Sequence, residues 1–202
     1  GIQAIGTAWS LINAGIADRA VAGAGEAPLT KFTLAQFQEL GAYNPTPTVP
    51  FPLRSLHPER TGTVFGEGAG MMYLSKDYDH SSSIAEIVGF AAATESGMKP
   101  GLSENGDGLQ RALAQALDQA DLKPSDIDLI IGHGSGTVKG DGSEFNAYSD
   151  FFGSDLPEIV YHKWSTGHLV GASGALSSVL ACLHLNTGIV SGHPYFPQES
   201  NF

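Results

Sequence analysis

The spacing of hydrophobic side chains along the chain predicts several amphipathic helices. Residues 1–14 carry apolar side chains at every third or fourth position, and Gly15 follows where such a helix would stop. Residues 30–40 repeat this spacing. The clearest case is residues 107–120, where one face carries Leu109, Ala112, Leu113, Ala116, Leu117 and Ala120. Two further helices are expected over residues 144–152 and, with many Gly and Ala, over residues 171–185.

Short apolar runs between these helices predict β-strands. They cover residues 19–25, 62–74, 84–93, 127–131 and 159–161. The first of them consists of small residues and Val, which is typical of a buried strand. Because strands alternate with helices, the sequence predicts a layered α/β domain with sheets that are at least partly parallel.

Two segments interrupt this pattern. The stretch 41–58 contains Pro45, Pro47, Pro50, Pro52 and Pro58, and we expect an irregular surface loop there. Ser81, Ser82 and Ser83 form a polar break that separates residues 1–80 from residues 81–202. The chain is long enough for a sizeable core, since 42% of its residues are hydrophobic.

Charge and cysteine content narrow the classes of function. The formal net charge is −11, which argues against nucleic acid as the main partner, because phosphate binding needs a basic surface. No run of uncharged apolar residues is long enough to span a membrane, and no signal peptide is visible at the first residues. Cys182 is the single cysteine, which fits a reducing, cytoplasmic location.

The first candidate for chemistry follows a predicted strand. His133 is followed by Gly134, Ser135, Gly136 and Thr137, and then by Asp141 and Glu144. Ligands of open α/β sheets bind at the carboxyl ends of strands, and glycines let backbone N–H groups approach a substrate closely. The competing interpretation, a Gly-rich turn with a capping histidine, is equally compatible with this segment alone.

The second candidate has a similar arrangement. Lys163 follows another predicted strand, and His168 stands just before the Gly/Ala-rich helix. A histidine near a helix N-terminus tends to stay neutral, and a neutral imidazole can donate a hydrogen bond to a developing oxyanion. Taken alone, a helix-capping segment with a solvated Lys163 is the simpler interpretation.

Other residues give weaker signals. Gly66 to Gly70 has neither dinucleotide-binding nor P-loop spacing, so we expect close backbone packing there. Cys182 lies among apolar residues and is expected to be a buried structural thiol. A zinc site is not expected, because His57, His80, His162, His184 and His193 lack metal-ligand spacing.

Taken together, these segments resemble the β-ketoacyl synthases of the thiolase-like superfamily. The start of the chain resembles the helix after the family's nucleophile, in the pattern C-x-x-G-x-x-x-I-G-x-A. Residues 22–28 resemble A-G-G-x-E-A-P, and residues 60–70 resemble R-D-G-F-V-x-G-E-G-A-G. Residues 133–144 resemble H-G-T-x-T-x-x-x-D-x-x-E, and residues 163–174 resemble K-S-x-x-G-H-x-x-G-A-x-G. The motifs occur in the family's order along almost the whole chain.

The resemblance implies a fold and a reaction. The fold would be the layered αβαβα arrangement, incomplete here, with residues 1–80 from the N-terminal half and 81–202 from the C-terminal half. The reaction would be the decarboxylative Claisen condensation of an acyl thioester with malonyl-carrier protein in fatty-acid or polyketide synthesis. The implied partners are acyl carrier protein and a second synthase-like chain, in a homodimer or heterodimer. No cofactor is expected beyond the phosphopantetheine of the carrier protein.

The resemblance also implies roles for individual residues. His133 and His168 would hydrogen-bond the malonyl thioester carbonyl and stabilise the enolate, and Lys163 would orient them. Ser135 and Thr137 would contact the pantetheine arm, and Asp141 and Glu144 would support the site. The pattern with two histidines is typical of chain-elongating synthases.

The chain departs from the family pattern in several places. The nucleophilic cysteine would lie three residues before Gly1, and about half of a full synthase, including its closing strands, would be missing. We therefore expect open sheet edges and exposed apolar faces. His57 stands where the family usually has an aspartate, and Ser177 where it commonly has a glutamate that pairs with the lysine.

The sequence is also compatible with two other functions. One is a non-catalytic partner subunit like the chain-length factors, which usually lose the nucleophile and often the histidines; both histidines are present here. The other is a plain acidic α/β interaction domain, which the ordered motifs disfavour. The residue three positions before Gly1 separates the first alternative from the enzyme.

Overall fold

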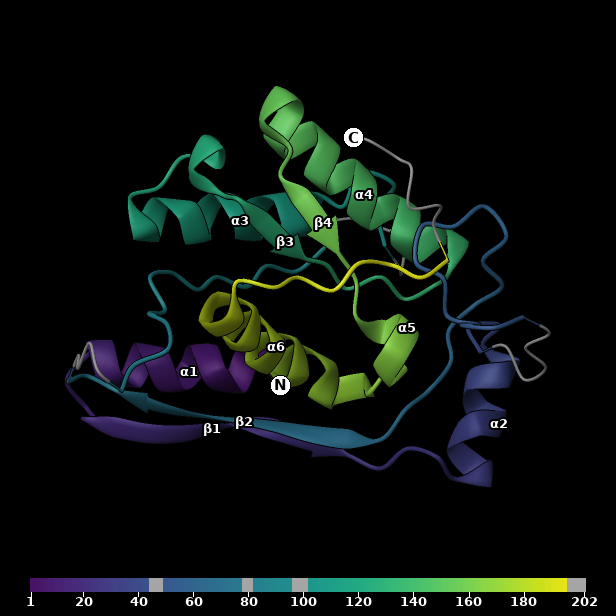
Figure 1. Ribbon diagram of the computed structural model, residues 1–202, viewed down its shortest axis with the longest axis horizontal. Helices are drawn as coiled ribbons and strands as arrows, with labels where there is room; N and C mark the ends of the chain where they lie inside the picture. Colours follow the sequence, from purple (N-terminus) through teal and green to yellow (C-terminus); the bar gives the residue numbers. More distant parts are fainter. Residues whose placement is uncertain (44–48, 78–81, 96–101, 196–202) are drawn as a thin grey trace.

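Two small β-sheets lie on either side of a pair of central helices in this computed structural model, which describes residues 1–43, 49–77, 82–95 and 102–195 (Figure 1). The central layer consists of α1 (Ile2–Asn13) and α6 (Ser173–Thr187). On one side lies the sheet of β1 (Arg19–Glu26) and β2 (Gly68–Ser75), and on the other that of β3 (Leu129–Ile131) and β4 (Glu158–Val160). The outer layer next to β3 and β4 consists of α3 (Asp107–Ala120) and α4 (Val138–Phe152).

Shorter elements connect these layers. Helix α2 (Lys31–Glu39) lies beside the far end of the first sheet, and α5 (Lys163–Thr166) lies near the end of α6 (Figure 1). Three short 3₁₀ turns complete the set: η1 (Pro124–Asp126), η2 (Gly153–Asp155) and η3 (Val170–Ala172). The predicted helices at 1–14, 30–40, 107–120 and 171–185 are thus confirmed to within a few residues.

Strands β1 and β2 pair antiparallel, from Arg19 opposite Ser75 to Glu26 opposite Gly68. One face packs against the central helices through small residues, with Ala22 and Ala175 in a buried cluster with Ile5 and Ala8. The other face is open: Val21, Met71 and Tyr73 are 65%, 56% and 64% exposed. The prediction that residues 19–25 are a buried strand was therefore wrong for this outer face, because no layer of the described chain covers it.

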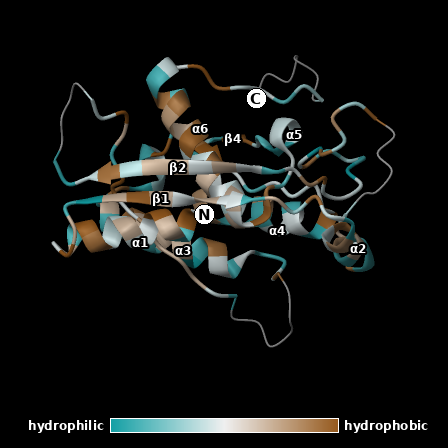
Figure 2. Ribbon diagram, turned by 90° about the horizontal axis from the view of Figure 1, so that it is seen from below, coloured by the Kyte–Doolittle hydropathy of each residue, from teal (hydrophilic) through white to brown (hydrophobic). Residues whose placement is uncertain are grey.

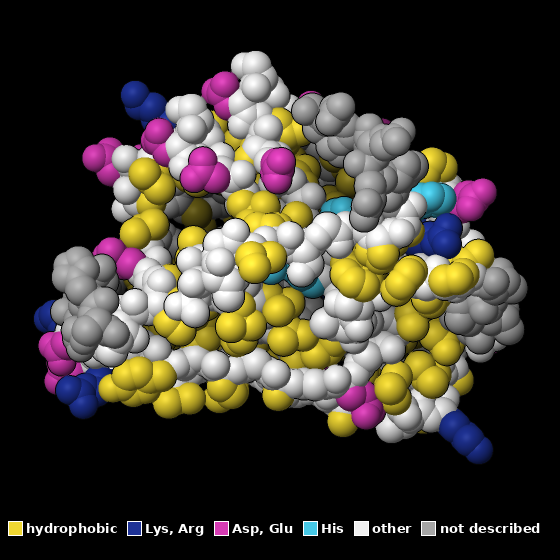
Figure 3. All heavy atoms as spheres, viewed as in Figure 1, with side chains coloured by type: hydrophobic (Ala, Val, Ile, Leu, Met, Phe, Trp, Pro, Cys, Tyr) yellow, Lys and Arg dark blue, Asp and Glu magenta, His cyan; other side chains and the backbone are white. Residues whose placement is uncertain are grey.

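The exposed apolar surface is visible from two directions. Figure 2 looks onto the outer face of β1 and β2, where hydrophobic positions occur in both strands. Figure 3 shows hydrophobic side chains along the lower edge of the molecule and in a band across its middle. A groove of about 450 Å³ lies in this region, lined by residues of α6 and β3 that include Leu129, Ile131, Ala181 and Leu185.

Strands β3 and β4 pair in parallel, from Leu129 opposite Glu158 to Ile131 opposite Val160. The N–H of Gly132 continues the ladder by donating to the carbonyl of Val160 at 2.9 Å. Because parallel strands end at the same edge of a sheet, the segments that follow β3 and β4 lie side by side. This arrangement places both motifs singled out in the sequence at one site.

Three expectations about secondary structure need correction. Residues 84–93 form no strand; instead they run extended along α1 and α3, where the indole of Trp9 donates to the carbonyl of Ile87. Helix α4 begins at Val138, six residues earlier than expected, because Thr137 caps it. In the loop 41–58, of which 44–48 lie outside the described residues, Leu53 and Ser55 are fully buried rather than at the surface.

Candidate active site at the ends of β3 and β4

His133 and His168 meet at the carboxyl ends of the second sheet. His133 follows β3, and His168 lies between α5 and η3. Their ring centroids are 5.0 Å apart, and the ring planes are nearly perpendicular, at 80°. His133 as a whole residue is exposed, whereas His168 is half-buried. The rings are thus close enough for one small group to touch both.

The hydrogen bonds of His168 define its tautomer. The N–H of Val170 donates to His168 Nδ1 at 2.9 Å, and the hydroxyl of Ser173 lies 3.3 Å from the same nitrogen. Val170 reaches this position with φ at +45°, a costly conformation for a β-branched residue. Since Nδ1 accepts, Nε2 carries the proton and is the donor of this ring.

Lys163 contacts Nδ1 of His133, as Val170 and Ser173 contact Nδ1 of His168. The ammonium group donates to the carbonyl oxygen of His133 and lies 3.3 Å from its Nδ1. The residue is only 5% exposed, so the interpretation of a solvated Lys163 was wrong. An ammonium group can only donate, so Nδ1 of His133 accepts and Nε2 again carries the proton.

Both imidazoles are neutral near pH 7. Burial, and next the charge of Lys163, lower the pKa of His168 to about 4. The pKa of His133 is lowered in the same direction by desolvation, by Lys163 and by His168. Burial also lowers the pKa of Lys163, to about 8, although the fields of Glu144 and Asp141 oppose this. The site therefore presents two neutral N–H donors next to one cation.

Glu144 holds the backbone of the first motif. Its carboxylate accepts from the N–H groups of His133 and Gly134 and from the hydroxyl of Tyr148, the last two at 2.8 Å. Burial raises the pKa of this carboxyl, and the same hydrogen bonds oppose the rise. Glu144 thus fixes the position of His133 through the backbone.

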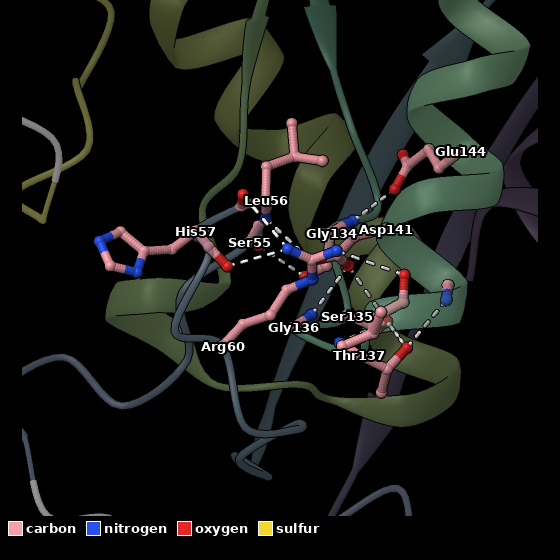
Figure 4. A network of polar contacts seen from close by, with 12 residues as sticks. Ser55, Leu56, His57, Arg60, Gly134, Ser135, Gly136, Thr137, Asp141 and Glu144 are labelled. Atoms are coloured by element: carbon pink, nitrogen blue, oxygen red, sulfur yellow. Dashed lines mark hydrogen bonds and ion pairs between the residues drawn. The ribbon is translucent and has the colours of Figure 1, made fainter.

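Asp141 joins the motif to the loop before β2 (Figure 4). It is fully buried, accepts from the N–H groups of Leu56 and Gly136, and lies 3.6 Å from Nε of Arg60. Ser55 adds a second link by donating to the carbonyl of Gly134 at 2.8 Å. Sequence reasoning missed Ser55 because it lies in a proline-rich segment that was expected at the surface.

Ser135 and Thr137 lie at the start of α4. The Thr137 hydroxyl accepts from the N–H of Gly140 at 3.1 Å and is 2.8 Å from the Ser135 hydroxyl. The Ser135 hydroxyl also reaches Asp141 at 3.3 Å. Both side chains are half-buried, and in this arrangement they cap the helix and complete the network around Asp141.

The glycine-rich segment before β2 holds the second histidine. The N–H of His168 donates to the carbonyl of Val64 at 2.7 Å, and the N–H of Gly66 donates back to the carbonyl of His168 at 3.2 Å. A Cβ added at Gly66 would lie 2.1 Å from the carbonyl oxygen of Thr166. The expectation of close backbone packing is therefore confirmed.

The start of α1 lies beside the same site. A Cβ added at Gly1 would be 2.6 Å from the carbonyl oxygen of Gly171, three residues after His168. The N-terminal end of α1 thus lies against the turn η3 that follows His168. Cys182 lies elsewhere on α6; it is half-buried, and burial raises the pKa of its thiol.

Comparison with known proteins identifies the family. The N-terminal domain model of β-ketoacyl synthases matches residues 1–80, and the C-terminal domain model matches residues 84–196. The chain belongs to the β-ketoacyl synthase family. The thiolase-like fold class predicted from the sequence is confirmed.

Individual synthases show how far this relationship extends. The chain is 29% identical to the 3-oxoacyl-[acyl-carrier-protein] synthase 2 of Staphylococcus aureus over 95% of its own length and 48% of the relative's. A ketosynthase structure in complex with its type II polyketide acyl-carrier protein, bound to a hexaketide, matches with a TM-score of 0.85 and 32% identity. That match covers 92% of this chain and 48% of the other. The ishigamide ketosynthase/chain length factor matches with a TM-score of 0.76 and 29% identity, covering 91% of this chain and 45% of the other.

The chain therefore spans about half the length of the curated relatives it matches. None of the helices in the described ranges is both long and apolar enough to cross a membrane.

Proposed function

We propose that the protein is a β-ketoacyl-[acyl carrier protein] synthase that extends an acyl chain by decarboxylative Claisen condensation. The observation that carries the proposal is the pair of neutral imidazoles, His133 and His168, with centroids 5.0 Å apart and their Nε2–H groups left as donors. Two preorganised donors suit a reaction that concentrates negative charge on a single oxygen. Loss of such a donor typically costs about 100- to 1,000-fold in rate.

The proposed reaction begins with malonyl-carrier protein in this site. The bond between the malonyl α-carbon and its carboxylate breaks, carbon dioxide leaves, and the electron pair forms an enolate. His133 and His168 donate their Nε2–H groups to the enolate oxygen. The α-carbon then attacks the acyl thioester carbonyl, a carbon–carbon bond forms, and the cysteine thiolate leaves.

The cysteine that carries the acyl group would lie three residues before Gly1. Support comes from the place of α1, whose N-terminal end lies against the turn after His168. A helix N-terminus lowers the pKa of a thiol and so favours the nucleophilic thiolate. A cysteine there would lie next to the two imidazoles.

The remaining residues are assigned supporting roles in this proposal. Lys163 holds the ring and the carbonyl of His133, Glu144 holds its backbone, and Asp141 ties the motif to the loop 55–60. Ser135 and Thr137 follow His133 closely at the start of α4, and we propose that they contact the pantetheine arm. No cofactor beyond that arm is proposed.

The protein's partners are proposed from the relatives. Similar solved structures include a ketosynthase in complex with its acyl-carrier protein and a ketosynthase in complex with its chain length factor. We propose acyl carrier protein as the substrate carrier, a second ketosynthase-like chain as the dimer partner, and a cytoplasmic location. The boundary near residue 80 is likewise proposed as the junction of two synthase halves.

Condensation by the complete protein tests the function. Acyl- and malonyl-carrier protein are supplied to the unchanged protein, to His133→Ala, to His168→Ala, and to His57→Ala as a control histidine outside the pair. We expect product from the unchanged protein and the control, and a loss of about 100-fold or more in each of the other two. Full product formation by both site variants would refute the roles assigned to the two rings.

A second measurement on the complete protein distinguishes an enzyme from a non-catalytic partner subunit. A chain-length-factor-like subunit would lack a cysteine three positions before Gly1 and would form no acyl-enzyme. Mass spectrometry of the complete protein after exposure to acyl-carrier protein detects the thioester directly. Its absence from a protein with that cysteine would count against the enzyme.

A further inference from the structure

Two further histidines, His162 and His184, form a hydrogen-bonded pair next to Lys163. Their Nε2 atoms are 2.8 Å apart, and the rings stack at 26° with centroids 4.9 Å apart. His162 lies between β4 and α5 and is 7% exposed, whereas His184 lies in the last turn of α6 and is half-buried. Both residues lie outside the segments that resemble the family's motifs.

The direction of this hydrogen bond follows from the other contacts of the pair. His184 Nδ1 lies 2.7 Å from the carbonyl oxygen of Ile189, which can only accept, so this nitrogen carries a proton. Nε2 of the neutral His184 ring is then an acceptor, and His162 Nε2–H donates to it. Burial, and next His184, lowers the pKa of His162 to about 4, so this ring is neutral near pH 7.

The backbone of His162 holds the start of α5. Its carbonyl oxygen accepts from the N–H groups of Ser165 and Thr166 at 3.0 and 3.3 Å, and from the Ser165 hydroxyl at 2.9 Å. Lys163 is the next residue, and its ammonium group holds the ring and the carbonyl of His133. A shift of His162 is therefore passed on to His133 through Lys163.

Helix α6 holds the other ring of the donor pair. The hydroxyl of Ser173, its first residue, lies 3.3 Å from His168 Nδ1. Its last turn carries His184. One helix therefore contacts His168 at one end and the support of His133 at the other.

Packing alone leaves room between the β4–α5 turn and α6. A cavity of about 10 Å³, large enough for one water molecule, lies there, and its lining includes His162, Lys163 and Ser177. Within the described ranges, the contact between His162 and His184 is the only hydrogen bond that joins residues 161–167 to α6. The spacing of these two elements thus depends on that hydrogen bond.

We propose that His162 and His184 are positioning residues for the two-imidazole site. Their hydrogen bond fixes the β4–α5 turn against α6, and so holds Lys163 and His133 at the distance from His168 that one enolate oxygen requires. A displacement of about 1 Å in such a site can cost roughly 100-fold in rate. The effect on rate rests on the proposed function, whereas the effect on the position of His133 does not.

The test compares His184→Phe with His184→Gln in the complete protein. Phenylalanine keeps a ring that can stack but accepts no hydrogen bond, whereas the glutamine side-chain carbonyl can accept from His162. In single-turnover condensation from a preformed acyl-enzyme, we expect His184→Phe to be about 10- to 100-fold slower per folded molecule. We expect His184→Gln to recover most of the lost rate. Asn186→Ala, at an exposed position of α6, is the control and should keep the rate of the unchanged protein.

Two readouts separate positioning from a general loss of stability. Formation of the acyl-enzyme should change little in His184→Phe, because no enolate forms in that step. In ¹⁵N NMR of the folded variant, the imidazole signals of His133 should change while those of His168 stay in place. His162→Phe serves if α6 does not accept the larger ring, and the double variant should be no slower than either single variant, because both residues act through one hydrogen bond.

Three results would overturn the proposal. They are full condensation by folded His184→Phe, unchanged His133 signals in that variant, and an equal loss of rate in His184→Gln. If the His133 signals change but the unchanged protein condenses no substrate, the positioning role stands and the proposed function fails.

Discussion

His133 and His168 point their protonated nitrogens away from the groups that hold them. Lys163 holds Nδ1 of the first ring, and Val170 and Ser173 hold Nδ1 of the second. The two rings come from separate strand ends, yet their centroids are 5.0 Å apart. In each of the two rings, therefore, Nδ1 accepts a fixed hydrogen bond and Nε2–H is left as the donor.

Tautomers provide the most direct test of this relationship. We expect ¹⁵N NMR of the complete protein at pH 7 to show both rings as neutral Nε2–H tautomers, because Nδ1 of each accepts a hydrogen bond. In Lys163→Met, His133 should lose this preference while His168 keeps it. An Nδ1–H tautomer, or a charged imidazolium, for either ring in the unchanged protein would contradict the arrangement.

Acid should destabilise the folded protein. The pKa of His168 is about 4 when folded against an ordinary 6.5, and that of His162 is lowered to a similar value. Between these values the unfolded chain binds more protons than the folded chain, so the free energy of unfolding falls as the pH drops from 6.5 towards 4. Urea unfolding of the complete protein at a series of pH values measures this.

Lys163 should affect the free energy of unfolding in a separate, alkaline pH range. Its pKa is about 8 when folded against an ordinary 10.5, so the unfolded chain again binds more protons across that range. The free energy of unfolding attributable to this residue should therefore rise as the pH increases from 8 towards 10.5. Lys163→Met should remove that rise; a persistent rise of the same size would assign it to another group.

Asp141→Asn tests the link between the first motif and the loop 55–60. The substitution leaves the partly buried Arg60 without its carboxylate and removes charge-assisted hydrogen bonds to backbone N–H groups. Breaking such a pair costs about 3 to 5 kcal/mol of unfolding free energy. Asp155→Asn, at an exposed position, should stay within about 0.5 kcal/mol of the unchanged protein in the same denaturant titration.

Gly66→Ala tests the attachment of His168 to the segment before β2. The added Cβ would meet the carbonyl oxygen of Thr166 at 2.1 Å, and the backbone must move to relieve this. We expect lower stability and a displaced His168, seen as a change in its NMR signals. Gly142→Ala is the matched control, because a Cβ there meets nothing within 4 Å and lies in α4. Equal effects of the two substitutions would contradict the packing argument.

The sequence by itself determined the helices, the alternation with strands and the two histidine motifs, because these depend on local spacing and on residue order. Residues 1–14 and 107–120 show the period of an amphipathic helix, and the structure has helices there. The sequence could not show that residues 84–93 form no strand, because a strand needs a hydrogen-bonding neighbour that no local pattern specifies.

Only the tertiary structure decided how the site is held. The burial of Lys163 and Ser55, the contact of Asp141 with Leu56, and the cavity beside Ser177 all join segments far apart in the chain. Each of these features depends on which backbone group or cavity faces a given side chain once the chain has packed. The residue types of the site can therefore be recognised from the sequence, but their charge states and tautomers follow from the fold.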